Sequence, residues 1–330
     1  MTRRLRRYRL LAFCAGVALA VVLLSYGLAP YQRDIAVFTA LYAMVAVGLT
    51  LLMGFGGQIS LGQGGFMALG AYTTGILAAR HGMPILPAVI LAPLVAALAG
   101  YVIGLPLLRL RGHHLAIATL AFAILVTVLL QNLSGLTGGP IGISGIPALS
   151  VAGVGLSGRA FYFLAWVVAL LTLVLAHFLV HSRPGRALRA LAENEEAAES
   201  LGVAVPLYRL HLFALAAALA GLAGGLYASY LGYISPDGFG VQLSILFLIM
   251  VVIGGLGSVW GALVGTVVIQ LLTQGLQQLA THPGLPARAP VVLETVVYAV
   301  ILVLIMLFLP SGLLPGLQAG SRRFRRPPAE

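Results

Sequence analysis

The sequence IAVFTALYAMVAVGLTLLM, residues 35–53, runs directly into GFGGQISLGQ, residues 54–63. The first part carries no charge and is long enough to cross the roughly 30 Å hydrocarbon core of a bilayer as a helix. The second part is rich in glycine and polar residues. Unwound backbone at membrane depth is tolerated only where protein or a water-filled cavity satisfies it. The pair predicts a membrane helix that ends beside a polar site.

The composition of the whole chain supports a lipid environment. Of its 330 residues, 60% are hydrophobic and 8% are charged, and the mean hydropathy is +1.05. A soluble globular domain has about 25% charged residues, so a water-soluble fold is excluded. The chain also has no lysine. It therefore contains no Walker A loop and no Schiff-base lysine.

Apolar runs like that of residues 35–53 recur along the chain. We predict an all-α, polytopic membrane helix bundle of about ten transmembrane segments in a single domain, residues 1–330. A glycine break at residues 254–258 makes a hairpin, or two spans, of residues 243–272. The predicted spans are residues 10–29, 35–53, 61–79, 84–108, 115–133, 161–180, 211–234, 243–253, 259–272 and 291–309.

The arginines predict the orientation of the bundle. Fifteen of the nineteen fall on one side when these spans are threaded alternately, and cytoplasmic segments carry the excess of basic residues. Both termini and the loop at about 181–210 are therefore expected in the cytoplasm, and the loop at about 134–160 outside. One alternative stays open: residues 10–29 could be a cleaved signal peptide ending in Gly27-Leu28-Ala29.

Half of the eight acidic residues crowd into the cytoplasmic loop, at Glu193, Glu195, Glu196 and Glu199. Ser182 can cap a helix that has Pro184 in its first turn, and Gly202 followed by Pro206 can end it. The helix between them has an apolar stripe beside a charged one. We expect it to lie at the inner membrane face, either as a coupling element or as a plain connector with internal ion pairs.

Several motifs resemble one protein family. The run Glu196-Ala197-Ala198-Glu199-Ser200-Leu201-Gly202 matches the E-A-A-x-x-x-G signature of permeases in ABC importers. Further stretches are similar to the permeases of branched-chain amino acid importers, and they occur in that family's order over about two thirds of the chain. They are residues 57–72 (GQISLGQGGFMALGAY), 109–122 (RLRGHHLAIATLAF), 136–143 (LTGGPIGI), 185–202 (GRALRALAENEEAAESLG) and 254–265 (GGLGSVWGALVG).

The resemblance implies a multi-pass permease of the bacterial inner (plasma) membrane, not an enzyme. It would pair with a second, related permease. Cytoplasmic ATPases using ATP and Mg would drive it, and a periplasmic or extracellular binding protein would deliver leucine, isoleucine or valine. No cofactor, metal or nucleic acid is expected in this chain. Gln63 and the His113-His114 pair depart from the family pattern, so they do not identify the cargo.

Two sets of residues are expected to carry the function. Coupling to the ATPase is assigned to Arg186, Arg189, Glu193, Glu196, Ala197, Ala198 and Gly202. The translocation pathway is assigned to Gly57, Gln58, Ser60 and Gln63, with Thr137, Gly138 and Gly139 of the outer loop. Other glycines, at Gly100/Gly104, Gly221/Gly225 and Gly257/Gly261/Gly265, have the small-xxx-small spacing of close helix packing.

Two other functions remain as alternatives. A permease of the same organisation could carry urea or a short amide. An ion-coupled secondary transporter would need ionisable residues inside the bundle, where the sequence offers only His177 and Glu294 as candidates.

Overall fold

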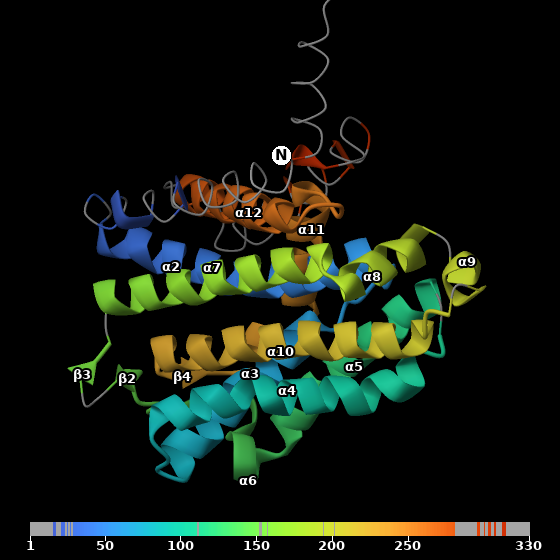
Figure 1. Cartoon of the computed structure of the whole chain (residues 1–330). Coiled ribbons are helices and arrows are strands. Elements are labelled where there is room, and N and C mark those ends of the chain that lie inside the picture. Colours follow the sequence, from blue (N-terminus) through green and yellow to red (C-terminus); the bar gives the residue numbers. More distant parts are fainter. Residues whose placement is uncertain are drawn as a thin grey trace, which may run out of the picture.

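The computed structural model describes residues 29–280, with gaps at 111, 152–153, 157, 194 and 201, and a few isolated positions within 16–27 and 296–314. Long helices lie side by side as a bundle (Figure 1). The α-helices are α2 (Pro30–Thr50), α3 (Gln63–Gly75), α4 (Ile85–Leu107), α5 (His113–Asn132), α6 (Ser134–Thr137), α7 (Arg159–His181), α8 (Arg183–Glu193), α9 (Glu195–Ser200), α10 (Val205–Leu231), α11 (Val241–Gly254) and α12 (Val259–Ala280).

Short elements join these helices. Two π-helical segments, η1 (Leu51–Phe55) and η2 (Ile76–Arg80), extend α2 and α3, and two 3-10 turns are η3 (Gly139–Ile141) and η4 (Pro236–Phe239). The strand β1 (Ile143–Ser144) pairs antiparallel with β4 (Tyr233–Ile234), and β2 (Ser150–Val151) pairs with β3 (Val154–Gly155). The predicted all-α membrane bundle is confirmed, since these strands have two residues each.

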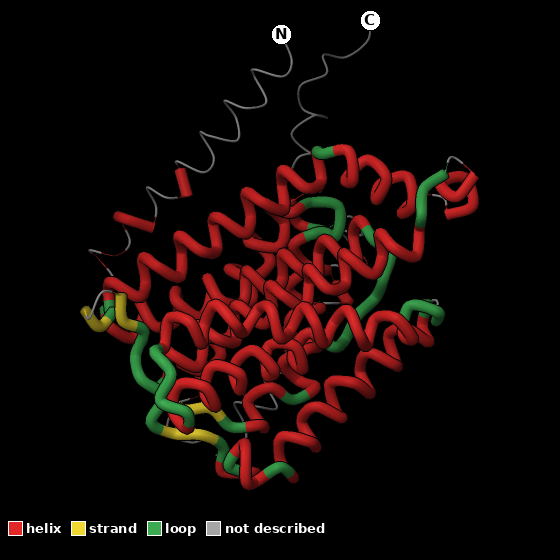
Figure 2. The backbone as a smooth tube through the Cα atoms, turned by 60° about the horizontal axis from the view of Figure 1, so that its bottom comes forward, coloured by secondary structure: helices red, strands yellow, loops and turns green. Residues whose placement is uncertain are grey.

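The strands gather at one end of the bundle, and α8 and α9 lie at the other (Figures 1 and 2). We call these the strand end and the coupling-loop end, the second after the loop at residues 181–210, to which coupling was assigned above. Two contacts tie helix termini together at the strand end. Tyr230 of α10 donates a hydrogen bond to Asp34 of α2, and its ring lies 4.7 Å from that of Phe161 at the start of α7.

Seven helices of the described residues are long and apolar enough to cross a membrane. The predicted count of about ten is therefore not confirmed. The predicted first and last spans, residues 10–29 and 291–309, lie outside the continuous described range. The predicted span 61–79 forms α3 with η2, which is not among the seven. The glycine break is present, because α11 ends at Gly254 and α12 begins at Val259 in contact with it.

Close contacts between small residues hold the centre of the bundle, where α10 packs on α2, α3 and α4. A Cβ atom on Gly70 would lie 2.1 Å from the carbonyl oxygen of Gly221, and one on Gly224 would lie 2.0 Å from that of Met67. The predicted small-residue packing is confirmed at Gly100, Gly104, Gly221, Gly225, Gly261 and Gly265, each of which has a neighbour within 3 Å of a built Cβ atom.

The packing prediction is wrong at Gly257. No atom lies within 4 Å of a Cβ atom built there. Gly257 belongs to the turn that joins α11 to α12, so it does not face another helix. A spacing of four residues places two glycines on the same face only if both lie in one helix, and Gly257 precedes α12.

Candidate functional site

The helix formed by α2 and η1 ends in an unwound segment, residues 56–62, before α3 begins at Gln63. Gly57 has a φ of +64°, which favours glycine at this turn. Just before it, a Cβ atom on Gly54 would meet the carbonyl oxygen of Leu256 at 1.8 Å. The end of η1, directly before the unwound segment, therefore touches the turn between α11 and α12, and the two glycine breaks of the chain form one junction.

The depth of the junction follows from its neighbours. A Cβ atom on Gly56 would lie 2.7 Å from the side chain of Leu212, which is seven residues inside the start of α10. At 1.5 Å of rise per residue, the unwound segment lies roughly 10 Å from the coupling-loop end of α10. The break predicted at membrane depth is therefore within the bundle, nearer to the coupling-loop end.

Three predicted pathway residues are buried in this segment and at the first position of α3. Gln58, Ser60 and Gln63 expose 3%, 1% and 1% of their surface. The Oε1 atom of Gln58 and both amide atoms of Gln63 have no hydrogen-bond partner. Each buried orphan group costs about 1–3 kcal/mol. Because these amide atoms have no partner within the protein, they are available to form hydrogen bonds with water or with a polar solute that passes.

Neighbouring helices hold the backbone of the unwound segment. The amide of Leu61 donates to Oγ1 of Thr119 on α5 at 2.9 Å, and the amide of Gly64 donates to Oγ of Ser244 on α11 at 3.0 Å. The amide of Gly62 donates to Oγ of Ser60 at 3.3 Å. Sequence reasoning missed Thr119 and Ser244, because single hydroxyl residues in apolar helices carry no signal of their partners.

The other predicted pathway residues are far from the unwound segment in the chain. Thr137 ends α6, Gly138 follows it, and Gly139 begins η3. Thr137 is buried, and its hydroxyl donates to the carbonyl oxygens of Leu130 and Leu133. Gly138 and Gly139 have φ values of +78° and +62°. These residues form a turn at the end of α5, and their polar groups are engaged locally.

A cavity of about 420 Å³ at the strand end was not predicted from the sequence. It lies among α2, α10, α11 and α12. Its signal was available in α12, where amide and hydroxyl side chains recur every three or four residues and thus share one face. The polar lining residues are Tyr31, Asp34, Tyr42, Tyr227, Gln270, Thr273, Gln274 and Gln277.

The coupling loop begins with the predicted cap. Ser182 Oγ accepts a hydrogen bond from the amide of Gly185 at 3.3 Å and donates one to the carbonyl oxygen of Leu179 at 2.6 Å. Arg189 reaches back and donates from Nη2 to the carbonyl oxygen of Val180 at 3.1 Å. These bonds fix α8 to the end of α7, while the Arg186 side chain is exposed.

The helix predicted between Pro184 and Leu201 consists of two described segments, α8 and α9. Ala198 is buried with Leu191 and Val205 in a small apolar cluster, as the predicted stripe requires. Gly202 ends α9 with a φ of +82°, and its amide donates to the carbonyl oxygen of Glu199 at 2.9 Å. The side chains of Glu193, Glu196 and Ala197 lie outside the described part of the structure.

The coupling loop and the helix break are in physical contact. Helix α8 packs on η1, which is also contacted by α7 and α10. Because η1 leads directly into the unwound segment, α8 packs on the chain segment that immediately precedes the backbone of Gln58. Among the described residues, no group of three His, Cys, Asp or Glu side chains could hold a metal ion.

Apolar crossing helices, a buried polar break and a loop helix that contacts this break define a membrane transport protein of the permease class. Residues 31–309 match the family model described as "Branched-chain amino acid transport system / permease component". The chain therefore belongs to this family of ABC importer permeases.

Relatives of known description agree. The chain is 34% identical over 306 residues to the high-affinity branched-chain amino acid transport system permease protein LivM of Escherichia coli K12, covering 86% of this chain and 69% of the relative. It is 28% identical over 291 residues to LivH of the same organism, covering 83% and 91%. A probable LivM of Methanocaldococcus jannaschii is 29% identical over 235 residues, with 68% of each chain covered. No solved structure gives a significant match.

Proposed function

We propose that this chain is the membrane permease subunit of an ATP-driven importer of leucine, isoleucine and valine. The observation that carries the proposal is the family match over residues 31–309. Two of the relatives named above are described as permeases of branched-chain amino acid transport systems. The chain has no lysine for a P-loop, so ATP and Mg are used by partner subunits.

The cargo passage is proposed to run along the two polar sites. A zwitterionic amino acid needs dipoles for its charged groups and an apolar wall for its side chain. The cavity at the strand end offers Asp34, tyrosines and the glutamines of α12. The unwound segment offers the unsatisfied amides of Gln58 and Gln63 at the N-terminus of α3. Helix N-termini carry a partial positive charge that suits a carboxylate.

The energy is proposed to enter through the coupling loop. Partner ATPases would press on α8 and α9, and α8 would pass the displacement to η1, with which it is in contact. The residues assigned to this task are Arg186, Arg189, Glu193, Glu196, Ala197, Ala198 and Gly202. Arg189 supports the role best, because it bonds α8 to the end of α7.

The working unit is proposed to contain a second, related permease, cytoplasmic ATPases and a substrate-binding protein outside the membrane. The arginine distribution favours an orientation with both termini and the coupling loop in the cytoplasm. The strand end then faces the binding protein. Urea or a short amide is the alternative cargo, which the amide-rich lining of both polar sites also suits.

Uptake of labelled leucine into proteoliposomes that contain the assembled complex tests the proposal. We expect uptake that requires ATP and the binding protein and that isoleucine and valine compete. Uptake by this chain alone under a proton or sodium gradient would contradict the importer class. ATP-dependent uptake competed by urea and not by leucine would keep the class and replace the cargo.

A variant pair tests the polar break in the same assay. Gln63→Leu removes two orphan polar atoms, so the protein should be at least as stable while uptake falls roughly tenfold, the equivalent of one lost hydrogen bond to the solute. Gln242→Leu changes an exposed glutamine of α11 and serves as the control. Full uptake by Gln63→Leu would remove Gln63 from the passage.

A further inference from the structure

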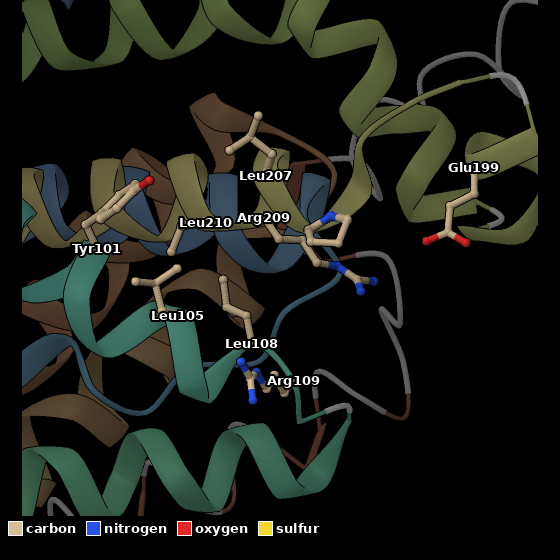
Figure 3. A pocket seen from close by; sticks show the side chains of 10 residues that line it. Tyr101, Leu105, Leu108, Arg109, Glu199, Leu207, Arg209 and Leu210 are labelled. Carbon is tan, nitrogen blue, oxygen red and sulfur yellow. The ribbon is translucent and has the colours of Figure 1, made fainter.

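A second cavity, of about 520 Å³, opens at the coupling-loop end (Figure 3). It lies between the end of α4 and the start of α10, and Glu199 of α9 lines its outer side. Neither the passage nor the predicted coupling contacts account for it. It lies where two membrane helices reach the membrane surface, so the side chains that line it indicate which kind of ligand it can bind.

The walls of the cavity divide into an apolar and a basic part. Leu105 of α4 and Leu108 directly after this helix line the cavity together with Leu207 and Leu210 of α10. Arg109 and Arg209 line the same cavity beyond Leu108, on the side toward water, and Tyr101 lies at the opposite side (Figure 3). Tyr101 is about 10 Å deeper along α4 than Leu108, at 1.5 Å per residue.

An apolar track leads away from the cavity along α4. Leu94, Leu98 and Leu105 expose 60%, 65% and 54% of their surface. Their spacing of four and seven residues places them on one face of the helix. On a membrane helix, such a face contacts acyl chains. The track therefore joins hydrocarbon at one end to two guanidinium groups at the other.

We propose that this cavity binds an anionic phospholipid. The phosphodiester would accept hydrogen bonds from Arg109 and Arg209, and an acyl chain would lie along the exposed leucines of α4. Arginine forms paired hydrogen bonds to phosphate oxygens, and basic pockets between membrane helices recognise anionic headgroups. The proposal is independent of the cargo and of the direction of transport.

The shape of the site favours a lipid over a free phosphate or a nucleotide. Four leucines contribute nothing to the binding of a free anion, whereas they complement the glycerol and upper acyl region of a lipid. Two arginines and the Glu199 carboxylate give the cavity a net charge of +1, which the single charge of a phosphodiester neutralises. A group with several negative charges would exceed this balance and be repelled by Glu199. The bound lipid would join α4 to α10 directly beside α9.

Native mass spectrometry of the delipidated full chain in detergent tests the site. The ligands are dioleoylphosphatidylglycerol, dioleoylphosphatidylcholine and glycerol 3-phosphate. We expect one equivalent of the phosphatidylglycerol to bind in preference to the phosphatidylcholine. Replacement of both Arg109 and Arg209 by Gln should weaken this binding roughly 25-fold, since each arginine near a membrane surface contributes about a factor of five.

A charge-matched control separates a site from general attraction. Arg183→Gln with Arg186→Gln removes two exposed charges from the same end of the molecule and should leave the affinity unchanged. Arg109→Gln alone changes an exposed residue after α4, so it keeps the test valid if the double variant does not fold. It should weaken binding roughly fivefold.

Three outcomes would overturn the proposal. The first is equal binding of the two lipids. The second is an equal loss of phosphatidylglycerol affinity in the double variant and in its charge-matched control. The third is displacement of bound phosphatidylglycerol by an equal concentration of glycerol 3-phosphate. The last would identify a site for a free phosphate instead. The site would be established if the protein prefers the anionic lipid and loses this preference when Arg109 and Arg209 are replaced, but not in the charge-matched control.

Discussion

At the scale of single residues, the bundle depends on positions where no side chain fits. Gly224 of α10 lies against α3, and a Cβ atom there would stand 2.0 Å from the carbonyl oxygen of Met67. Backbone at this distance cannot turn away as a flexible side chain can, so even a methyl group must push the two helices apart. Gly275 of α12 is a helical glycine with no atom within 4 Å of a Cβ atom built on it.

The same substitution at these two glycines should have opposite effects. Gly224→Ala should lower the free energy of unfolding by about 1–3 kcal/mol, because overpacking strains a tight contact. Gly275→Ala should raise it by about 0.5–1 kcal/mol, because alanine loses less backbone entropy in a helix. Thermal unfolding of the purified chain in detergent measures both. Equal midpoints for the two variants would show that α3 and α10 are not held at this distance.

At the scale of elements, the coupling loop consists of α8 and α9 with a glycine turn into α10. Gly202 has a φ of +82°, yet nothing lies within 4 Å of a Cβ atom at this position. The backbone conformation, and not a lack of space, therefore disfavours β-branched residues at this position. A β-branched residue at this φ is strained by about 1–3 kcal/mol, while asparagine adopts it readily.

Two variants isolate the turn. Gly202→Val should move α9 relative to α10 and reduce ATP-dependent leucine uptake by the assembled complex roughly tenfold, as strain of this size predicts. Gly202→Asn should retain most of the uptake. The amounts of both variants in the membrane should match the wild type. If valine and asparagine behaved alike, the turn would have no part in coupling.

Sequence patterns predicted the elements better than their contacts. The apolar runs located the long helices, and Ser182, Gly202 and the break at residues 254–258 marked helix ends, since these signals are local. The contact of Gly54 with Leu256 and that of α8 with η1 depend on the three-dimensional arrangement. For the same reason, Gln63 could be placed at a break, but its unsatisfied amide could not be foreseen.

At the scale of the whole molecule, the two ends of the bundle differ in chemistry. The coupling-loop end carries Arg109, Arg183, Arg186, Arg189 and Arg209. The strand end carries only three arginines of the described residues, Arg33, Arg80 and Arg159, together with two carboxylates, Asp34 and Asp237. Basic residues collect on the cytoplasmic side of bacterial membrane proteins, so this asymmetry predicts the orientation.

Cysteine labelling in intact cells checks the orientation. In a Cys14→Ser background, an impermeant maleimide added outside should label Gly135→Cys and not Arg186→Cys. Both positions are exposed in the structure. Permeabilised cells provide the control, because both variants should then be labelled. Labelling of Arg186→Cys in intact cells would reverse the orientation and move the coupling loop outside.

The central position of α3 has a consequence for how the protein is made. This helix is rich in glycine and nearly all buried, and α10 is one of the helices that cover it. During synthesis α3 emerges from the ribosome about 140 residues before α10, from the start of one to the start of the other. Helix α10 is complete only when residue 231 has been added. Until then, the face of α3 that α10 will cover is exposed to lipid or to an insertase. Co-translational assembly of this bundle thus has a long stage in which α3 has been made but the helix that covers it has not.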